Sequence, residues 1–284
     1  VIDDPELPVE LMLDRAKLAA KTIKGQFLKN YAFYTDDMGA ALEEEQQIIN
    51  EMVHALETEQ FTVYFQPKYN VKSKLPVGAE ALVRWEHPEK GLISPGKFVP
   101  IFEKNGFITK LDFYVWNKVC FMLRGWLDEG EKPNPISVNM SRVNLFNPNI
   151  VKILCDLTDS YNIPRELLQL ELTESAYADA TAAMKEKVKR FREEGFLVLM
   201  DDFGSGYSSL NVLKDIEVDV LKIDMRFFET SDIGGRGENI VASVIRMAKW
   251  LDIPTIAEGV EKEEQVEFLR NIGCEFVQGY YFAK

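Results

Sequence analysis

The sequence is poor in the side chains that build soft-metal and disulfide sites. Its 284 residues include only two histidines, and its three cysteines, Cys120, Cys155 and Cys274, lie far apart. Without a C-x-x-C pair, we expect neither a zinc–thiolate centre nor a disulfide framework, and a reducing cytoplasmic location fits best. A metal site would therefore be built mainly from oxygen ligands, which select hard cations such as Mg²⁺ or Mn²⁺.

Long apolar runs and an excess of positive charge are also lacking. No stretch approaches the roughly 18 to 20 apolar residues that a membrane helix needs, and the first residues do not have the layout of a signal peptide. The formal charge of −13 argues against DNA as a partner, because DNA is bound by basic patches. It does not exclude an anionic substrate held by a metal. Because the chain begins with Val, we expect it to be part of a longer protein.

From about residue 60 onward, short apolar runs alternate with helical stretches. Segments such as 182–195 and 238–251 carry apolar residues three and four apart, which is typical of amphipathic helices. Alternation of strand and helix predicts an α/β fold with a parallel sheet, here a (β/α)8 TIM-like barrel. The eight candidate strands are FTVYFQPKY, VGAEALVRW, PISVNMS, LLQLELTES, FLVLMDDFG, VDVLKID, PTIAEGVE and FVQGYYF.

The first two candidate strands break this alternation. Only about seven residues, NVKSKLP, separate FTVYFQPKY from VGAEALVRW, whereas a parallel crossover needs about a dozen or more. We therefore predict a barrel whose first strand runs antiparallel to the second.

The N-terminal part has a different pattern. VELMLDRAKLAAKTIKG predicts a helix ending at Gly25, NYAFYTDD a strand, and GAALEEEQQIINEMVHALETEQ a second helix with acids in its first turn, where they suit the helix dipole. One helix and one strand cannot bury a core alone. We interpret residues 1–37 as the end of an upstream domain, 38–58 as a connecting helix and 59–284 as the barrel.

Polar side chains follow the ends of the candidate strands. In a barrel of this type the carboxyl ends of the strands converge on one mouth, where active sites lie. Each residue alone has an ordinary explanation, since a strand-end Glu is usually solvated and a Lys can extend its charge out of a strand. Together, so many carboxylates would repel one another unless positive charge lay among them. Divalent cations and one lysine would supply it. The leading residues are Glu80, Asn139, Glu171, Asp201, Asp202, Lys222, Glu258 and Gln278.

The segment MDDFGSGYSSL places two adjacent carboxylates, Asp201 and Asp202, where an apolar run ends. Neighbours within a strand point to opposite faces, but past its end this rule relaxes. We therefore expect both to bind metal, one bridging two ions and the other serving the second. GSGYSS would be a flexible loop over the mouth, held by Glu174.

Seven motifs occur in a fixed order, namely EALVRW, NMS, ELTE, DDFGSGYSSL, KID, AEGVE and QGYYF. Together they resemble the EAL domain, the family of cyclic-di-GMP phosphodiesterases, from about residue 58 to the end. The segment LDRAKLAAKTIKG is similar to the last part of a GGDEF (diguanylate cyclase) domain. The signature loop of that domain is absent, so we expect no cyclase activity from this segment.

The resemblance implies an irregular barrel and a role for each matching residue. It implies two Mg²⁺ or Mn²⁺ ions, a homodimer formed through the barrel, and an upstream GGDEF or sensory domain. Ser205 stands where Thr is commoner. The implied metal ligands are Glu80, Asn139, Glu171, Asp201 and Asp202; the catalytic groups are Lys222, Glu258 and Asp202; the substrate-binding residues are Arg84, Gln66 and Gln278; and the supports of the mobile loop are Glu174, Glu261 and Ser205.

The resulting hypothesis is metal-dependent hydrolysis of cyclic di-GMP to linear 5′-pGpG. The alternative is a catalytically silent cyclic-di-GMP receptor, although such family members usually lose several metal ligands, and all those that can be placed are present here. A third hypothesis is an unrelated Mg²⁺ barrel enzyme acting on a small carbon acid. The loop motif and QGYYF speak against it through the resemblance alone.

Overall fold

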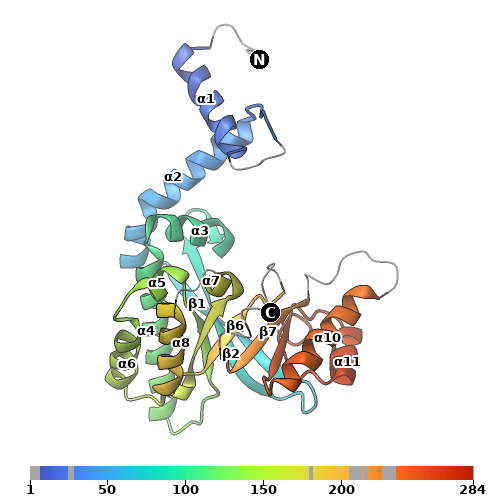
Figure 1. The fold of residues 1–284 in the computed structure, drawn as a ribbon. Coiled ribbons are helices and arrows are strands. Elements are labelled where there is room, and N and C mark those ends of the chain that lie inside the picture. The colour runs from blue at the N-terminus through green and yellow to red at the C-terminus, as the bar shows by residue number, and fades with distance from the viewer. Residues whose placement is uncertain are drawn as a thin grey trace.

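Eight strands close into a barrel, and helices cover its outside (Figure 1). The structure is a computed structural model that describes residues 7–24, 29–178, 182–204, 213, 217–225 and 235–283. All eight predicted strands are present. They are β1 (Phe61–Asn70), β2 (Pro76–His87), β4 (Ile136–Asn139), β5 (Leu168–Thr173), β6 (Val198–Asp201), β7 (Val220–Asp224), β8 (Thr255–Glu258) and β9 (Phe276–Val277).

The first strand runs antiparallel to both of its neighbours. β1 pairs with β2 and with β9 in this sense, whereas every pairing from β2–β4 round to β8–β9 is parallel. The predicted antiparallel first strand is therefore confirmed. A further strand, β3 (Gly91–Ile93), was not predicted; it is short and extends β2 beyond the barrel as a hairpin. Gly91 permits the tight turn because it adopts φ +69°.

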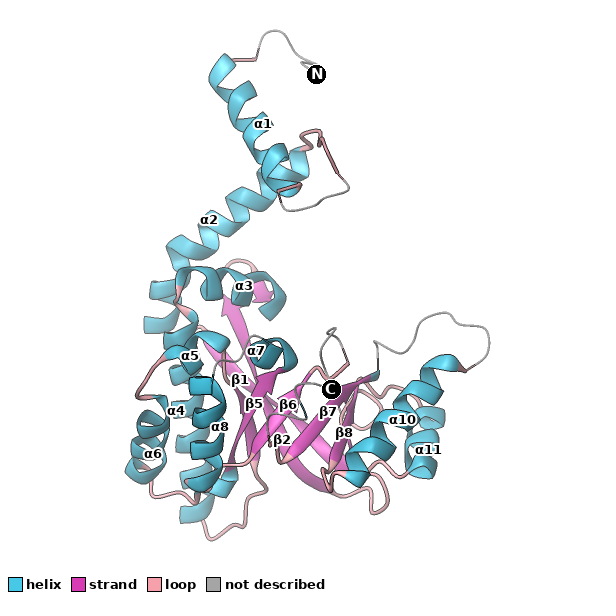
Figure 2. Ribbon diagram, viewed as in Figure 1, coloured by secondary structure: helices cyan, strands magenta, loops and turns pink. Residues whose placement is uncertain are grey.

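The helices divide into those that cover the barrel wall and those at the mouth (Figure 2). The wall helices are α4 (Ile108–Asp128), α6 (Ile150–Ser160), α8 (Ala182–Glu193), α10 (Arg236–Trp250) and α11 (Glu263–Ile272). Short helices α5 (Arg142–Phe146) and α7 (Glu174–Ala178) follow β4 and β5, and α3 (Pro95–Asn105) follows the β3 hairpin. A 3₁₀ turn, Arg165–Leu167, leads into β5.

Strand alternation decides which side chains face the helices. Along β5, Leu168, Leu170 and Leu172 are fully buried in the main apolar cluster. Glu171, between two of them, therefore points to the opposite face, into the barrel. The same alternation in β4 sends Ser137 inward between Ile136 and Val138. Polar residues inside these strands mark the barrel interior.

A second apolar cluster joins the N-terminal helix α2 (Asp36–Glu57) to the barrel. Ile48 and Ala55 of α2 are buried there with aromatic residues that include Trp85 and Phe102. Trp85 also donates an indole hydrogen bond of 2.9 Å to Gln60 Oε1. The half of α2 nearest the barrel is therefore part of the barrel's packing.

The predicted strand NYAFYTDD was wrong. Residues 29–35 are coil, and Asp36 and Asp37 form the first turn of α2. Acidic residues favour a helix N-terminus, and a lone strand would leave its backbone groups without a ladder. Helix α1 (Val9–Thr22) precedes this coil. None of the described helices is long and apolar enough to cross a membrane.

We expect Leu170→Ala to lower the free energy of unfolding by about 2–5 kcal/mol, because it leaves a cavity in a closely packed cluster. Leu75→Ala is the matched control, since Leu75 is 63% exposed, and it should change the stability by less than about 0.5 kcal/mol. Urea denaturation followed by tryptophan fluorescence measures both. Equal losses would contradict the assignment of the core.

Candidate active site

The ammonium group of Lys222 lies among four carboxylates in the barrel mouth. Lys222 comes from β7, and its side chain is fully buried. Its Nζ is 3.1 Å from Glu80 Oε2, 2.5 Å from Glu171 Oε2, 3.1 Å from Asp201 Oδ1 and 2.6 Å from Glu258 Oε1. These acids come from β2, β5, β6 and β8, so five strands contribute to one cluster.

A second lysine joins this cluster from β1. Lys68 Nζ lies 2.9 Å from Glu171 Oε1 and 2.5 Å from Ser137 Oγ. No role was predicted for Lys68 or Ser137. Alternation along the strand could have indicated that Lys68 faces the site, because Lys68 is two residues from Gln66 and so lies on the same face of the strand.

Fully ionised, the four carboxylates would exceed the two ammonium groups by two negative charges. Burial raises the pKa values of Glu80 and Asp201, and it raises that of Glu258 well above its ordinary value. Burial also opposes ionisation of Glu171, but the two lysines outweigh it and lower its pKa to about 2. A divalent cation among these acids would offset their repulsion and favour their ionised forms.

The donors in the cluster do not satisfy every acceptor. A lysine has three N–H groups, and Lys222 makes hydrogen bonds to Glu80 and Glu171. Among the described residues, Glu258 Oε1 and Gln278 Oε1 are buried without a hydrogen bond, although Glu258 Oε1 lies only 2.6 Å from Lys222 Nζ. The contact between Lys222 and Glu258 is therefore an ion pair, in which the ammonium is poorly oriented to donate a hydrogen bond.

This donor set fits a hard cation. Its ligands are carboxylate and amide oxygens, and two of its buried oxygens lack a hydrogen bond. Within the described part of the chain, no three acidic, His or Cys side chains are already arranged around a metal position. The Lys222 ammonium instead stands between them.

Three amides surround Glu80. Asn139 at the end of β4 donates to Glu80 Oε1 over 3.1 Å. Gln278, which is buried after β9, donates to Glu80 Oε2 over 2.7 Å and to Gln66 Oε1 over 2.9 Å. Gln66 itself lies opposite Glu80 in the β1–β2 pairing. The structure thus brings these four predicted site residues together.

Asp201 and Asp202 separate at the end of β6. Asp201 is the last strand residue, and Asp202 adopts φ +57°. Asp is among the few residues that tolerate this left-handed conformation. The Asp202 N–H donates to Asp201 Oδ1 over 2.9 Å, so the turn both ends the strand and orients the first carboxylate.

The three predicted loop supports have different positions. Glu174, buried at the start of α7, accepts a hydrogen bond of 3.0 Å from the Gly204 N–H. Glu261 is exposed, and its N–H donates to Gln265 Oε1 over 2.8 Å. Ser205 lies outside the described residues.

A cavity of about 740 Å³ opens beside the cluster. Glu80 and Asn139 line it on the cluster side, and Arg84 lines it further along β2. The Arg84 guanidinium donates to the Val83 carbonyl over 2.9 Å and lies 6.0 Å from the centre of the Tyr64 ring. One carboxylate of the cluster and an arginine therefore face one space of ligand size.

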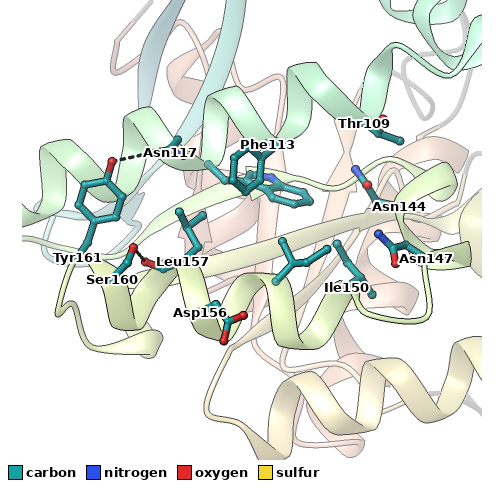
Figure 3. A pocket seen from close by; sticks show the side chains of 12 residues that line it. Thr109, Phe113, Asn117, Asn144, Asn147, Ile150, Asp156, Leu157, Ser160 and Tyr161 are labelled. Carbon is teal, nitrogen blue, oxygen red and sulfur yellow. Dashed lines mark hydrogen bonds between the residues drawn. The ribbon is translucent and has the colours of Figure 1, made fainter.

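Another hollow, of about 640 Å³, lies on the outer wall between α4 and α6 (Figure 3). Phe113 and Leu157 line it together with asparagines, and its single carboxylate is Asp156. Figure 3 also shows the hydrogen bond from Tyr161 to Asn117 that bridges the two helices. Without a charge cluster, this hollow is a poor candidate for the active site.

The family model for the EAL domain matches residues 49–284 of the chain. The bifunctional diguanylate cyclase/cyclic di-GMP phosphodiesterase MucR of Pseudomonas aeruginosa is 34% identical over 278 residues, which cover 97% of this chain and 40% of MucR. The cyclic di-GMP phosphodiesterase NbdA of the same organism is 33% identical over 275 residues, 97% of this chain and 35% of NbdA. The chain thus spans well under half the length of both relatives.

A solved structure of the MucR phosphodiesterase in complex with c-di-GMP has the same fold. It superposes with a TM-score of 0.79 at 34% sequence identity, covering 84% of this chain and 96% of that one.

Asp112 of α4 is a buried carboxyl that lines the cavity, so its ionisation should make the stability of the chain depend on pH. Its burial raises its pKa to about 6, and its Oδ2 accepts hydrogen bonds from the Ser141 N–H (2.9 Å) and Asn144 Nδ2 (2.7 Å). Because the folded-state pKa exceeds the unfolded one, ionisation opposes folding, and stability is lost as the pH rises from about 4 to about 6. Asp112→Asn keeps one oxygen to accept both hydrogen bonds. Relative to the wild-type chain, its free energy of unfolding should gain about 2 kcal/mol between pH 4.5 and pH 7.

Urea denaturation at the two pH values measures this difference. Asp128→Asn is the control for removing an acid from the same helix, because the Asp128 side chain is 67% exposed. If the difference in free energy of unfolding between Asp112→Asn and the wild-type chain were the same at both pH values, the raised pKa of Asp112 would be contradicted.

Proposed function

We propose, since the chain belongs to the EAL domain family, that it hydrolyses one phosphodiester bond of cyclic di-GMP and releases linear 5′-pGpG. The observation that carries the proposal is the cluster of four carboxylates around Lys222, one of which, Glu80, lines a cavity that Arg84 also lines. The names of MucR and NbdA and the c-di-GMP complex of MucR support the choice of substrate.

The cluster would hold Mg²⁺ or Mn²⁺, with two ions per site. Glu80, Asn139, Glu171 and Asp201 supply the oxygens, and Asp202 would complete the second position. When bound, such ions polarise the phosphate and lower the pKa of a coordinated water. They also offset the repulsion between an acidic protein and a dianionic nucleotide.

The chain's own residues provide binding, orientation and proton handling. Arg84 would hold a phosphate oxygen by charge-assisted hydrogen bonds. Burial would lower the pKa of Lys222, but its four carboxylates raise it well above the ordinary value, so its ammonium stays charged and can stabilise negative charge on the phosphate. Gln278 and Gln66 fix Glu80, and Glu174 would hold the loop after Asp202, with Glu261 and Ser205 as further supports.

The reaction adds the oxygen of water to phosphorus and breaks the bond from phosphorus to the 3′ oxygen. One proton of the water ends on that 3′ oxygen, and the 5′ phosphate stays on the product. Glu258 is the group that we assign to hold a proton during this exchange, because burial raises the pKa of its carboxyl well above the ordinary value.

The wider setting is also part of this proposal. We infer a homodimer formed through the barrel, residues 1–37 as the end of a GGDEF-like domain, residues 38–58 as the connection from an upstream sensory or GGDEF domain, and a cytoplasmic location. The helix α2 at Asp36–Glu57 supports the connection. The charge of −13 supports the view that DNA is not a partner.

Turnover of cyclic di-GMP should require a divalent cation. We expect linear pGpG with Mg²⁺ or Mn²⁺ and none after chelation, measured by chromatography of the nucleotides. Nucleotide binding without turnover at any metal concentration would favour the receptor, and sugar phosphates as the better substrates would favour an unrelated barrel enzyme.

Glu80→Ala should reduce turnover by at least about 100-fold, because it removes a ligand rather than an outer partner. Glu86→Ala is the matched control, since Glu86 lies on the same strand, is exposed and contacts Tyr64. Near-normal turnover by Glu80→Ala would refute the assigned ligand set.

A further inference from the structure

Glu171 is held through both of its carboxylate oxygens by different cations. Lys222 Nζ lies 2.5 Å from Oε2, and Lys68 Nζ lies 2.9 Å from Oε1. The side chains of Glu171 and Lys68 are 0% and 4% exposed, respectively. Two fixed donors on opposite oxygens define both the position and the rotation of the carboxylate plane.

Lys68 is itself fixed from behind. Its Nζ contacts Ser137 Oγ at 2.5 Å, and Ser137 is fully buried on β4, which lies beyond β2 in the barrel. Lys68 pairs with Gly78 of β2, and Ser137 pairs with Glu80 on the other side of the same strand. Lys68 therefore reaches across the barrel floor from β1 to the side chains of β4 and β5.

We propose that Lys68, anchored by Ser137, is a positioning residue that holds Glu171 in the orientation in which its carboxylate would bind the divalent cation. This inference rests on the proposed function only in taking Glu171 as a metal ligand. Partners that orient a ligand in this way typically contribute about 10–100-fold to metal affinity.

Charge alone predicts the opposite effect. A lysine near a cation repels it, so removing Lys68 without any loss of orientation would strengthen metal binding. Loss of orientation would weaken it. The direction of the change therefore separates a positioning residue from a mere neighbouring charge.

The experiment is a titration of the chain with Mn²⁺ in the absence of nucleotide, with the free ion followed by electron paramagnetic resonance. Lys68→Met keeps the length of the side chain and removes its charge and donors, and we expect its Mn²⁺ affinity to fall about 10–100-fold. Raising the Mn²⁺ concentration should then restore most of the turnover.

Ser137→Ala keeps every charge and removes only the anchor, so it should weaken Mn²⁺ binding in the same direction by a smaller factor. It also keeps the test decisive if Lys68→Met does not fold. Lys118→Met is the charge-matched control, because Lys118 lies on the outside of α4 and pairs with Glu59. Its affinity should equal that of the wild-type chain.

Unchanged or tighter binding by both Lys68→Met and Ser137→Ala would overturn the proposal, as would an absence of Mn²⁺ binding by the wild-type chain. Failure of the proposed function has a different signature. If the wild-type chain binds Mn²⁺ and Lys68→Met weakens that binding, but cyclic di-GMP is not hydrolysed, the positioning role stands and the activity does not.

Discussion

The burial of one ammonium group among four carboxylates is the constraint on which the rest of the site depends. Lys222 can remain charged inside the barrel only because the acids surround it. The acids in turn approach one another only because positive charge lies between them. Neither set could be buried alone, so the strands that carry them have to arrive together. The site is therefore complete only in the closed barrel.

Such a polar interior contributes little to stability, since desolvation offsets much of the attraction within it. The apolar residues supply the stability instead, in one cluster between strands and wall helices and a second one around Trp85 and Phe102. Because side chains alternate along each strand, the polar interior and the apolar clusters can coexist. Leu170 and Leu172 are directed to the helices, while Glu171 faces inward.

Much of this arrangement could be predicted from the sequence. The predicted strands carry Glu80, Glu171, Asp201, Lys222 and Glu258, and the short NVKSKLP connection required an antiparallel first strand. Lys68 was missed because a lysine in an isolated strand pattern usually extends to the surface, and only the closed barrel shows that it points to Ser137. The predicted strand before α2 failed because nothing in the sequence shows whether a strand will find a partner. The position of the Lys222 ammonium among the carboxylates could not be predicted either. The five strands that carry these residues must close into a barrel before their side chains come into contact.

The reversed direction of β1 has a consequence for how the barrel is entered. In a regular barrel the segment before the first strand arrives at the end away from the chemistry. Here only Thr58, Glu59 and Gln60 separate α2 from β1, and β1 begins near the rim that β2 reaches with Arg84, since Thr62 and Arg84 are paired. α2 also packs on α3, which borders the cavity. A rotation of α2 would therefore act directly on the residues at the entrance of the cavity, and it would not have to be transmitted along the strands of the sheet.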